Sequence, residues 1–236
     1  MIKVGCCGFP VKKQRYFEHF DVIEIQRTFY NLPKIETVLK WRGEAPNGFE
    51  FTLKAWQLIT HPSKSPTYKK AGLQVSEECG GKYGFFRPTG EVFEAWRKTK
   101  EIGRALSARI ILFQCPASFK PTTENIKNLK NFFKTIDRHD FLMVWEPRGE
   151  WDDRDIIALC RELNLIHCVD PFEGESLHGE IKYFRLHGGP GYRHKYSKEE
   201  LLWLKEKCSR HKVTYCMFNN IVMFDDALRF KEILTV

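Results

Sequence analysis

The pattern of hydrophobic and polar positions changes its period repeatedly along the chain. Short runs of apolar, β-branched and aromatic residues alternate with longer segments whose apolar residues recur at helical spacing. The short runs predict eight β-strands, at 2–6, 21–26, 49–54, 109–114, 140–146, 165–170, 182–187 and 213–218. The longer segments predict helices at 34–44, 91–107, 123–137, 153–164, 197–211 and 225–234, with shorter helical pieces near 13–19 and 66–72.

Residues that favour helix N-termini support three of these helices. Thr122 and Asp152 each stand immediately before a predicted helix, where a side-chain oxygen can accept a backbone N–H. Ser197, with Glu200 three residues later, has the spacing of a capping box. These caps support the alternation of strands with helices.

The order of the elements defines the fold class. Strands that alternate with helices pair in parallel, because each helix returns the chain through a right-handed crossover. Eight such units in 236 residues have the number and length of a (β/α)8 barrel. We therefore predict an α/β fold, a TIM-barrel-like single domain over 1–236, with a long excursion between the third and fourth strands. An open doubly wound sheet shares the alternation, but no GxGxxG sequence follows the first strand.

Composition excludes several classes of protein. With 42% hydrophobic and 29% charged residues, the chain has enough apolar side chains to form a core and is not disordered. No run approaches the roughly 18 apolar residues of a transmembrane helix, and the first residues do not resemble a signal peptide, so we expect no membrane partner. Eight cysteines without a CxxC pair or a zinc-finger spacing indicate reduced thiols in a cytoplasmic protein.

Positive charge is concentrated in the first hundred residues. The formal net charge is +8, and residues 1–100 contribute +7 of it. The segment 54–87, in the long excursion, carries six basic and two acidic residues interleaved with five aromatic ones. Such a segment can follow a phosphate backbone and stack on bases, which makes nucleic acid a candidate partner. The alternative, which we favour, is a solvated excursion whose aromatic side chains pack against the body of the protein.

Polar residues stand at the C-terminal ends of seven predicted strands, where the active site of a TIM barrel lies. A barrel interior is normally filled by Val, Ile and Leu, and an unpaired buried polar group costs about 1–3 kcal/mol. The set therefore predicts a functional site better than it predicts packing. Its members are Glu24, Gln26, Lys54, Gln114, Glu146, Arg148, Asp170, Arg185, His187, Asn219 and Asn220.

Several of these residues lie in stretches that resemble the YecE-like family, a domain-of-unknown-function family with a TIM-barrel-like fold, and the chain is identified as an archaeal-type member. The stretches are 24–30 (EIQRTFY), 51–54 (FTLK), 59–61 (ITH), 112–119 (LFQCPASF), 144–148 (VWEPR), 169–170 (VD), 184–188 (FRLHG) and 217–220 (MFNN). The resemblance implies the fold and a polar pocket at the strand ends, and it implies no reaction. Within these stretches, Tyr30 and His61 are predicted to bind substrate. Where the family often has a Gly-Trp pair, this chain has Cys7, Gly8 and Phe9, so we expect the first loop to line the site differently.

Metal-assisted chemistry is one interpretation of the strand-end residues. Glu24, Glu146, Asp170 and His187 are oxygen and imidazole donors on different strands, as in sites that hold divalent ions. Lysine and arginine side chains on the same rim would oppose a metal unless the carboxylates pair with them. The cofactor is therefore left unknown, with a divalent metal as a candidate.

Metal-free acid–base chemistry on a phosphate-bearing substrate is the second interpretation. Barrels often bind phosphate with the loops after strands seven and eight, and Gly188 and Gly189 would let backbone N–H groups approach an anion there. Arg148 and Arg185 could bind the anion through two N–H groups each. Glu24 or Glu146 would act as general acid or base, with its pKa tuned by a nearby Lys54.

An iron–sulfur or thiol redox site is a third interpretation, which we do not favour. Cys6, Cys7, Cys79 and Cys115 lie after strands one and four or in the long excursion, and four thiolates could hold a cluster. Their spacing matches no ligand motif, and adjacent Cys6 and Cys7 would point to opposite faces of a strand.

These observations favour a hydrolase or isomerase-like enzyme on a small anionic substrate. We predict Glu24, Glu146, His187 and Lys54 as catalytic residues. The predicted substrate-binding residues are Arg148, Arg185, Gln114, Asp170, Asn219, Asn220, Tyr30, His61, Gly188 and Gly189. The alternative function is a non-catalytic nucleic-acid-binding protein that uses segment 54–87.

Overall fold

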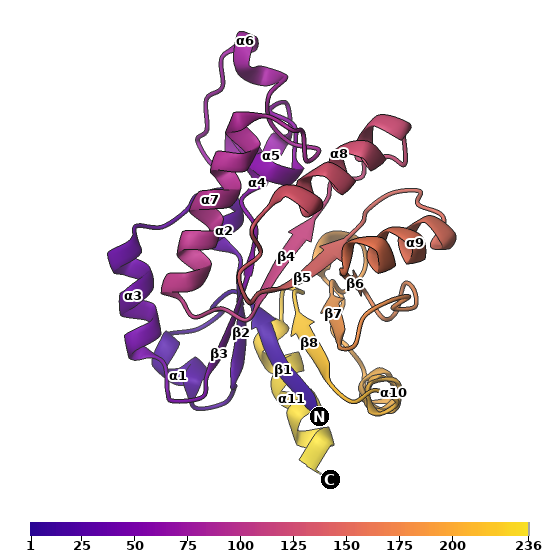
Figure 1. The fold of residues 1–236 in the computed structure, drawn as a ribbon. Coiled ribbons are helices and arrows are strands. Elements are labelled where there is room, and N and C mark those ends of the chain that lie inside the picture. Colours follow the sequence, from indigo (N-terminus) through magenta and orange to yellow (C-terminus); the bar gives the residue numbers. More distant parts are fainter. Residues whose placement is uncertain (236) are drawn as a thin grey trace.

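The eight predicted strands are all present, and they close into a barrel (Figure 1). The computed structural model describes residues 1–235. The strands are β1 (Ile2–Cys7), β2 (Val22–Ile25), β3 (Glu50–Lys54), β4 (Ile110–Gln114), β5 (Leu142–Glu146), β6 (Ile166–Val169), β7 (Lys182–Leu186) and β8 (Thr214–Phe218). Each strand pairs in parallel with the next, and β8 pairs with β1. The predicted fold class is confirmed, whereas the single domain over 1–236 stays a prediction whose last residue lies outside the described residues.

The helices surround the barrel and agree with the helical segments of the sequence. The longer ones are α3 (Ile35–Glu44), α7 (Gly90–Ala105), α8 (Thr123–Thr135), α9 (Asp153–Leu163), α10 (Lys198–Ser209) and α11 (Met223–Thr235). The shorter ones are α1 (Lys13–Phe17), α2 (Arg27–Tyr30), α4 (Gln57–Thr60), α5 (Pro66–Lys70) and α6 (Glu77–Gly80), with a 3-10 turn at Pro190–Tyr192. All three predicted N-caps form: Thr122 and Asp152 accept backbone N–H groups, and Ser197 and Glu200 complete the capping box.

One connection departs from the regular alternation of strands and helices. Residues 170–181, all of them described, contain no helix between β6 and β7. Pro171, Gly174 and Gly179 interrupt this segment, and Gly179 has a φ of +122°, a conformation closed to most other residues. The sequence predicts no helix in this segment either, so the connection agrees with the predicted helices, and all eight strands of the barrel are present.

Two layers of apolar side chains hold the barrel together. The outer layer lies between strands and helices and includes Cys6, Phe113 and Trp145. The inner layer fills the barrel and includes Cys7 and Tyr183. Successive strand residues point to opposite faces, so both faces of every strand are buried and the strands appear in the sequence as nearly continuous apolar runs.

The barrel interior also holds polar side chains at its N-terminal end. Lys3 forms an ion pair with Glu50, and the hydroxyl of Tyr215 donates to Glu50 Oε2 at 2.7 Å. The Tyr215 ring stacks on that of Tyr183, with centroids 5.7 Å apart. Tyr183 in turn lies below the strand-end residues at the opposite mouth, so polar groups occur along the whole axis of the barrel.

The long excursion lies at the C-terminal end of the barrel. Its helices α5 and α6 project beyond the point where β3 and β4 terminate (Figure 1). Within residues 1–235, no helix is both long enough and apolar enough to cross a membrane.

Candidate functional site

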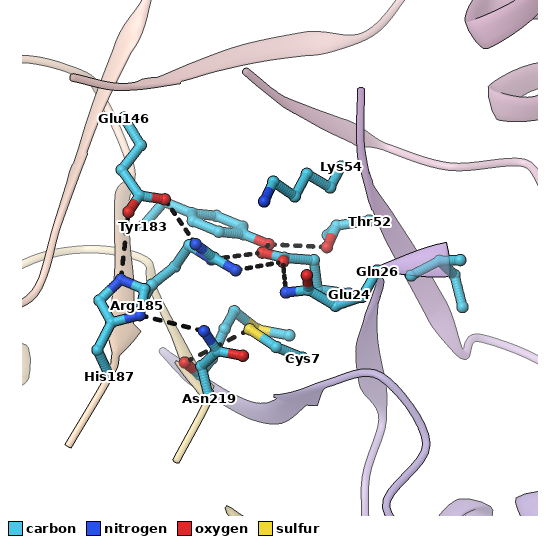
Figure 2. A network of polar contacts seen from close by, with 12 residues as sticks. Cys7, Glu24, Gln26, Thr52, Lys54, Glu146, Tyr183, Arg185, His187 and Asn219 are labelled. Atoms are coloured by element: carbon cyan, nitrogen blue, oxygen red, sulfur yellow. Dashed lines mark hydrogen bonds and ion pairs between the residues drawn. The ribbon is translucent and has the colours of Figure 1, made fainter. Parts of the chain in front are cut away.

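Arg185 on β7 is the centre of the strand-end cluster (Figure 2). Its side chain is 1% exposed and pairs with two carboxylates from other strands. Nη1 donates to Glu146 Oε2 at 2.7 Å, while Nη2 and Nε donate to the two oxygens of Glu24 at 3.0 and 3.2 Å. This two-point pairing with Glu24 is the geometry in which an arginine binds a carboxylate most strongly. All three nitrogen atoms of the Arg185 guanidinium therefore already donate to carboxylates of the protein.

Glu24 on β2 has both carboxylate oxygens occupied and is fully buried. Besides Arg185, Gln26 Nε2 donates to Oε1 at 2.7 Å and the Tyr183 hydroxyl donates to Oε2 at 2.9 Å. The Thr52 hydroxyl lies 2.8 Å from that of Tyr183. Burial, reinforced by the charge of Glu24, raises the pKa of Tyr183 well above its ordinary value. The sequence reasoning missed Tyr183 and Thr52, although Tyr183 shares a strand face with Arg185.

Glu146 on β5 links Arg185 to the outer part of the cluster. Its Oε1 accepts from Arg148, with Nε at 2.9 Å and Nη2 at 2.7 Å, and lies 3.2 Å from His187 Nε2. Burial alone would raise the pKa of Glu146, but Arg185, His187 and Arg148 outweigh it and hold the pKa well below its usual range. Glu146 is therefore ionised at neutral pH. For Arg148, burial acts to lower the pKa, and the Glu146 carboxylate outweighs burial and raises it.

His187 is held in a defined orientation at the end of β7. Its Nδ1 lies 3.1 Å from Asn219 Nδ2, and its Nε2 lies 2.7 Å from Arg148 Nη2 as well as near Glu146. Asp170 positions the backbone beneath the ring, because its two oxygens accept the N–H groups of His187 at 2.7 Å and Phe172 at 3.0 Å. A histidine with both ring nitrogens in polar contact is suited to moving protons.

Lys54 at the end of β3 completes the cluster. Its Nζ lies 3.6 Å from the centroid of the Phe29 ring, and no residue of 1–235 forms a hydrogen bond with it. Burial, together with the charges of Arg185 and Arg148, lowers the pKa of Lys54 to about 7, although Glu146 and Glu24 oppose this change. His61 packs edge-on against Phe29, and burial followed by the charge of Lys54 lowers its pKa to about 3, so that ring is neutral.

Other predicted site residues lie at the margin of the cluster. Gln114 is paired in register with Glu146 on the neighbouring strand and is half-buried. Tyr30 presents its carbonyl to Trp56 Nε1 and Gln57 Nε2, both at 3.2 Å. Gly189 is exposed after β7, with a φ of +64°.

Two of the predicted residues face elsewhere. The Asn220 amide is 1% exposed and donates to His194 O and to Asp226 Oδ2, which attaches the loop after β7 to α11. The N–H of Gly188 donates to the Tyr196 hydroxyl at 2.9 Å and is not free for an anion. Both residues stabilise the loop instead of pointing into the cluster.

A cavity of about 320 Å³ opens beside the cluster, between the ends of β5, β6 and β7. Glu146, Arg148, Asp170 and His187 line it, together with His167. Burial lowers the pKa of His167 to about 4, so its ring is neutral at neutral pH.

The carboxylates are not arranged as metal ligands. The Arg185 guanidinium lies between Glu24 and Glu146, and each of their oxygens already accepts an N–H or O–H group. Asp170 accepts two backbone N–H groups. In the described part of the chain, no group of three or more His, Cys, Asp and Glu side chains could hold an ion. The donor set therefore does not fit the metal proposed from the sequence.

The cysteines proposed as cluster ligands are separated by the fold. Cys6 belongs to the outer layer and Cys7 to the inner one, as the strand alternation predicts. Cys115 accepts the Trp145 indole N–H at 3.3 Å, whereas Cys79 lies in the excursion on α6. Burial raises the pKa of Cys6 to about 12. Cys6, Cys7 and Cys115 are buried packing residues, Cys79 is not buried, and the four thiols do not converge on one site in the described structure.

The aromatic residues of segment 54–87 pack against the protein. Tyr68 is 2% exposed and Phe86 is fully buried, with Phe119 and Phe113 against the Phe86 ring. Trp56, Tyr83 and Phe85 are half-buried. These rings are not displayed as a stacking surface for bases, which agrees with the interpretation that we favoured.

The fold and the strand-end cluster together define a TIM-barrel-like protein with a buried carboxylate–guanidinium network. A family model described as protein of unknown function DUF72 matches residues 12–235, so the chain belongs to that family. It is 40% identical over 48 residues to UPF0759 protein YecE of Escherichia coli K12, covering 20% of this chain and 18% of the relative. It is 28% identical over 120 residues to UPF0759 protein YunF of Bacillus subtilis 168, covering 50% and 36%. These two matches span 18% and 36% of the length of the curated relatives. The predicted YecE-like family is confirmed by the family model together with these relatives.

Solved structures agree with the fold along the whole chain. A DUF72 family protein from Enterococcus faecalis V583 superimposes with a TM-score of 0.75 at 22% identity, covering 100% of this chain and 98% of that one. A DUF72 family protein from Thermotoga maritima MSB8 gives 0.71 at 22%, covering all of both chains. A D-tagatose 3-epimerase-like protein gives 0.57 at 14%, covering 99% and 96%. Likeness at these identities shows the fold alone.

Proposed function

We propose that this chain is an enzyme that acts on a small anionic substrate, a phosphate ester or phosphodiester, by acid–base chemistry at the C-terminal ends of the strands. One observation carries the proposal: two cationic side chains of the cluster keep free donor atoms. Arg148 uses Nε and Nη2 toward Glu146 and His187, and its Nη1 has no hydrogen-bond partner within residues 1–235. Lys54 Nζ is equally free of hydrogen bonds in that range.

Charge balance in the cluster supports an anionic ligand. The two carboxylates, Glu24 and Glu146, neutralise the two guanidinium groups of Arg185 and Arg148. Protonated Lys54 then leaves the cluster with one positive charge. An incoming anion restores neutrality and can accept from Arg148 Nη1 beside the cavity, and a hydrogen bond to a charged donor contributes about 1.5–3 kcal/mol.

In this proposal, proton transfer belongs to His187 and Lys54. An acid or base is most effective when its protonated and deprotonated forms are both populated at the working pH, as for a lysine whose pKa is lowered to about 7. Glu146 is ionised and its oxygens are occupied, so it positions Arg148 and His187. Acid–base chemistry is favoured over metal assistance because Arg185 lies between the two carboxylates.

Binding of inorganic phosphate and glycerol 3-phosphate, measured by calorimetry, tests the anion site. The variant Arg148→Ala should weaken binding at least about tenfold, which corresponds to one charged hydrogen bond. Arg104→Ala, which removes an exposed arginine from α7, is the matched control and should leave affinity unchanged. Equal affinities for Arg148→Ala and the wild type would contradict the proposal.

Turnover tests the enzymatic part. The wild type, assayed with p-nitrophenyl phosphate and bis(p-nitrophenyl) phosphate, should release nitrophenol in the absence of added metal and in the presence of a chelator. His187→Ala should lose at least about a hundredfold in rate, the usual contribution of a general acid or base. Activity that disappears with the chelator, or that persists undiminished in His187→Ala, would overturn the acid–base assignment.

The proposed location is the cytoplasm. All eight cysteines lie within the described residues and are free thiols. Reduced thiols are typical of that compartment, and fractionation of cells that express the chain would test this part of the proposal.

A further inference from the structure

Lys54 is a buried amine whose Nζ forms no hydrogen bond or ion pair with the described residues 1–235. The residue is 7% exposed, and its side chain extends toward the carboxylates of the cluster without a contact to either (Figure 2). Its Nζ lies over the Phe29 ring, at 3.6 Å from the centroid. Within residues 1–235, Lys54 Nζ forms no ion pair with Glu24 or Glu146, whose oxygens are occupied by other donors.

We propose that Lys54 is a nucleophilic amine that forms an imine with an aldehyde or ketone. The substrate class is then a carbonyl compound that also carries an anionic group, such as a phosphorylated sugar or keto acid. The anionic part of this inference rests on the proposed function. The nucleophilic role of the amine does not depend on it.

The surroundings of Lys54 supply the uncharged amine that such a reaction needs. Arg185 and Arg148 disfavour the ammonium form, Glu146 and Glu24 favour it, and the neutral His61 ring adds no charge. Burial decides the balance and lowers the pKa of Lys54 to about 7. About half of the Lys54 amines are then uncharged at pH 7, whereas an ordinary exposed lysine has about one uncharged amine in 2,500. Desolvated lysines activated in this way serve as nucleophiles in other enzymes.

The chemical step balances without any further reactant. The lone pair of Nζ attacks the carbonyl carbon, a C–N bond forms, and the C=O π electrons move to oxygen. One proton moves from nitrogen to that oxygen, and His187 or water supplies a second as the C–O bond breaks and water leaves. The product is a protonated imine, and its positive charge lies beside the Glu146 and Glu24 carboxylates.

Reductive trapping tests the inference directly. The wild type is incubated at pH 7 with pyridoxal 5′-phosphate and cyanoborohydride, which reduces the imine by adding hydride to its carbon, and the modified lysine is located by peptide mass spectrometry. Lys54 should be the first lysine modified, at least about ten times faster than exposed lysines because of its larger uncharged fraction. The rate at Lys54 should reach half its maximum near pH 7 and level off about one unit higher, while rates at exposed lysines should still rise toward about pH 10.

Matched variants show whether the fast reductive modification depends on the Lys54 amine. Lys54→Arg keeps the charge and removes the nucleophile, so the fast modification should disappear. Lys70→Arg is the control, because Lys70 also lies over an aromatic ring, that of Tyr30, but is exposed. Fast modification that persists in Lys54→Arg, or wild-type modification that is slow or distributed over exposed lysines, would overturn the inference. The wild-type map and pH profile decide the question even if Lys54→Arg folds poorly.

Pyridoxal, which lacks the phosphate, separates this inference from the proposed function. If both aldehydes modify Lys54 and the phosphate gives no advantage, Lys54 is a nucleophile and the anion site is wrong. If phosphate and glycerol 3-phosphate bind through Arg148 but neither aldehyde modifies Lys54, the anion site stands and the imine is overturned.

Discussion

The buried ionic network makes a quantitative prediction about Arg185→Met. Methionine keeps an unbranched apolar stem but is shorter than arginine and carries no charge, so the substitution leaves the Glu24 and Glu146 carboxylates without their shared partner. Glu24 is fully buried and Glu146 is 3% exposed. Removing one member of a buried ion pair costs about 3–5 kcal/mol, because the remaining charge is neither paired nor hydrated. We expect a loss of that size in the free energy of unfolding at pH 8.

The pH dependence of this loss has a definite sign. In the wild type, the pKa of Glu146 is lower in the folded protein than in the unfolded chain. The ionised Glu146 therefore stabilises the fold fully at pH values above the unfolded-state pKa, and this stabilisation is lost as the pH falls through the folded-state pKa. Without Arg185, the effect of burial prevails and raises the pKa of Glu146. The variant then gains a proton as the pH falls, so its deficit relative to the wild type should be smaller at pH 5 than at pH 8.

Urea unfolding of both proteins at pH 5 and pH 8, followed by circular dichroism, measures these differences. Arg97→Met is the matched control, because Arg97 pairs with Glu94 and Glu101 on the exposed surface of α7 and should contribute little. If Arg185→Met costs no more than Arg97→Met, or if its deficit is the same at both pH values, the electrostatic reasoning is wrong.

Three further predictions concern a glycine after β7, the carboxylate of Asp170 and the thiol of Cys79. Gly188→Ala should lower the free energy of unfolding, measured in urea, by about 1–3 kcal/mol, because φ is +72° and the new Cβ would lie 2.7 Å from that of Asn220. The control Gly43→Ala has open space around its new Cβ and should stabilise α3 by about 0.5–1 kcal/mol. Asp170→Asn should cost about 1–3 kcal/mol, because it weakens the acceptor of the His187 and Phe172 N–H groups; equal stability would refute that positioning role. Iodoacetamide should modify one thiol rapidly in the native protein, that of Cys79, which is the only cysteine not buried within residues 1–235; a fast phase that survives in Cys79→Ser would contradict this.

Much of the fold was predictable from the sequence because both faces of each strand are buried. The strand Ile110–Gln114 appears as four apolar residues and a glutamine, too short a run for a typical helix. It stands between a segment of helical period and the helix that Thr122 caps. The one-turn helices α2, α4 and α6 were missed, because four residues are too few to show a helical period.

The sequence predicted which residues gather at the site, but not which of them pair with one another. Placement at strand ends brought Glu24, Glu146, Arg185 and His187 to one mouth of the barrel, as parallel strands require. Which oxygen meets which guanidinium depends on the stagger of the strands around the closed sheet, and that stagger has no signal in local sequence. For the same reason the spacing of Asn219 and Asn220 could not show that only the former reaches His187.

The network at the strand ends is not what the barrel needs in order to fold. Replacing a buried ionic triad by apolar residues of similar volume is often neutral or stabilising by about 1–4 kcal/mol. Elsewhere inside the barrel, apolar side chains such as Leu112, Val144 and Met217 are buried together. At the positions of Glu24, Arg185 and Glu146, Leu or Met would therefore make the folded barrel at least as stable. What they provide instead is a fixed layer with one net negative charge, which Arg148 balances, at the end of the barrel where Lys54 and His187 also lie. In the proposed function, this layer holds in place the groups that bind the anion and transfer the proton.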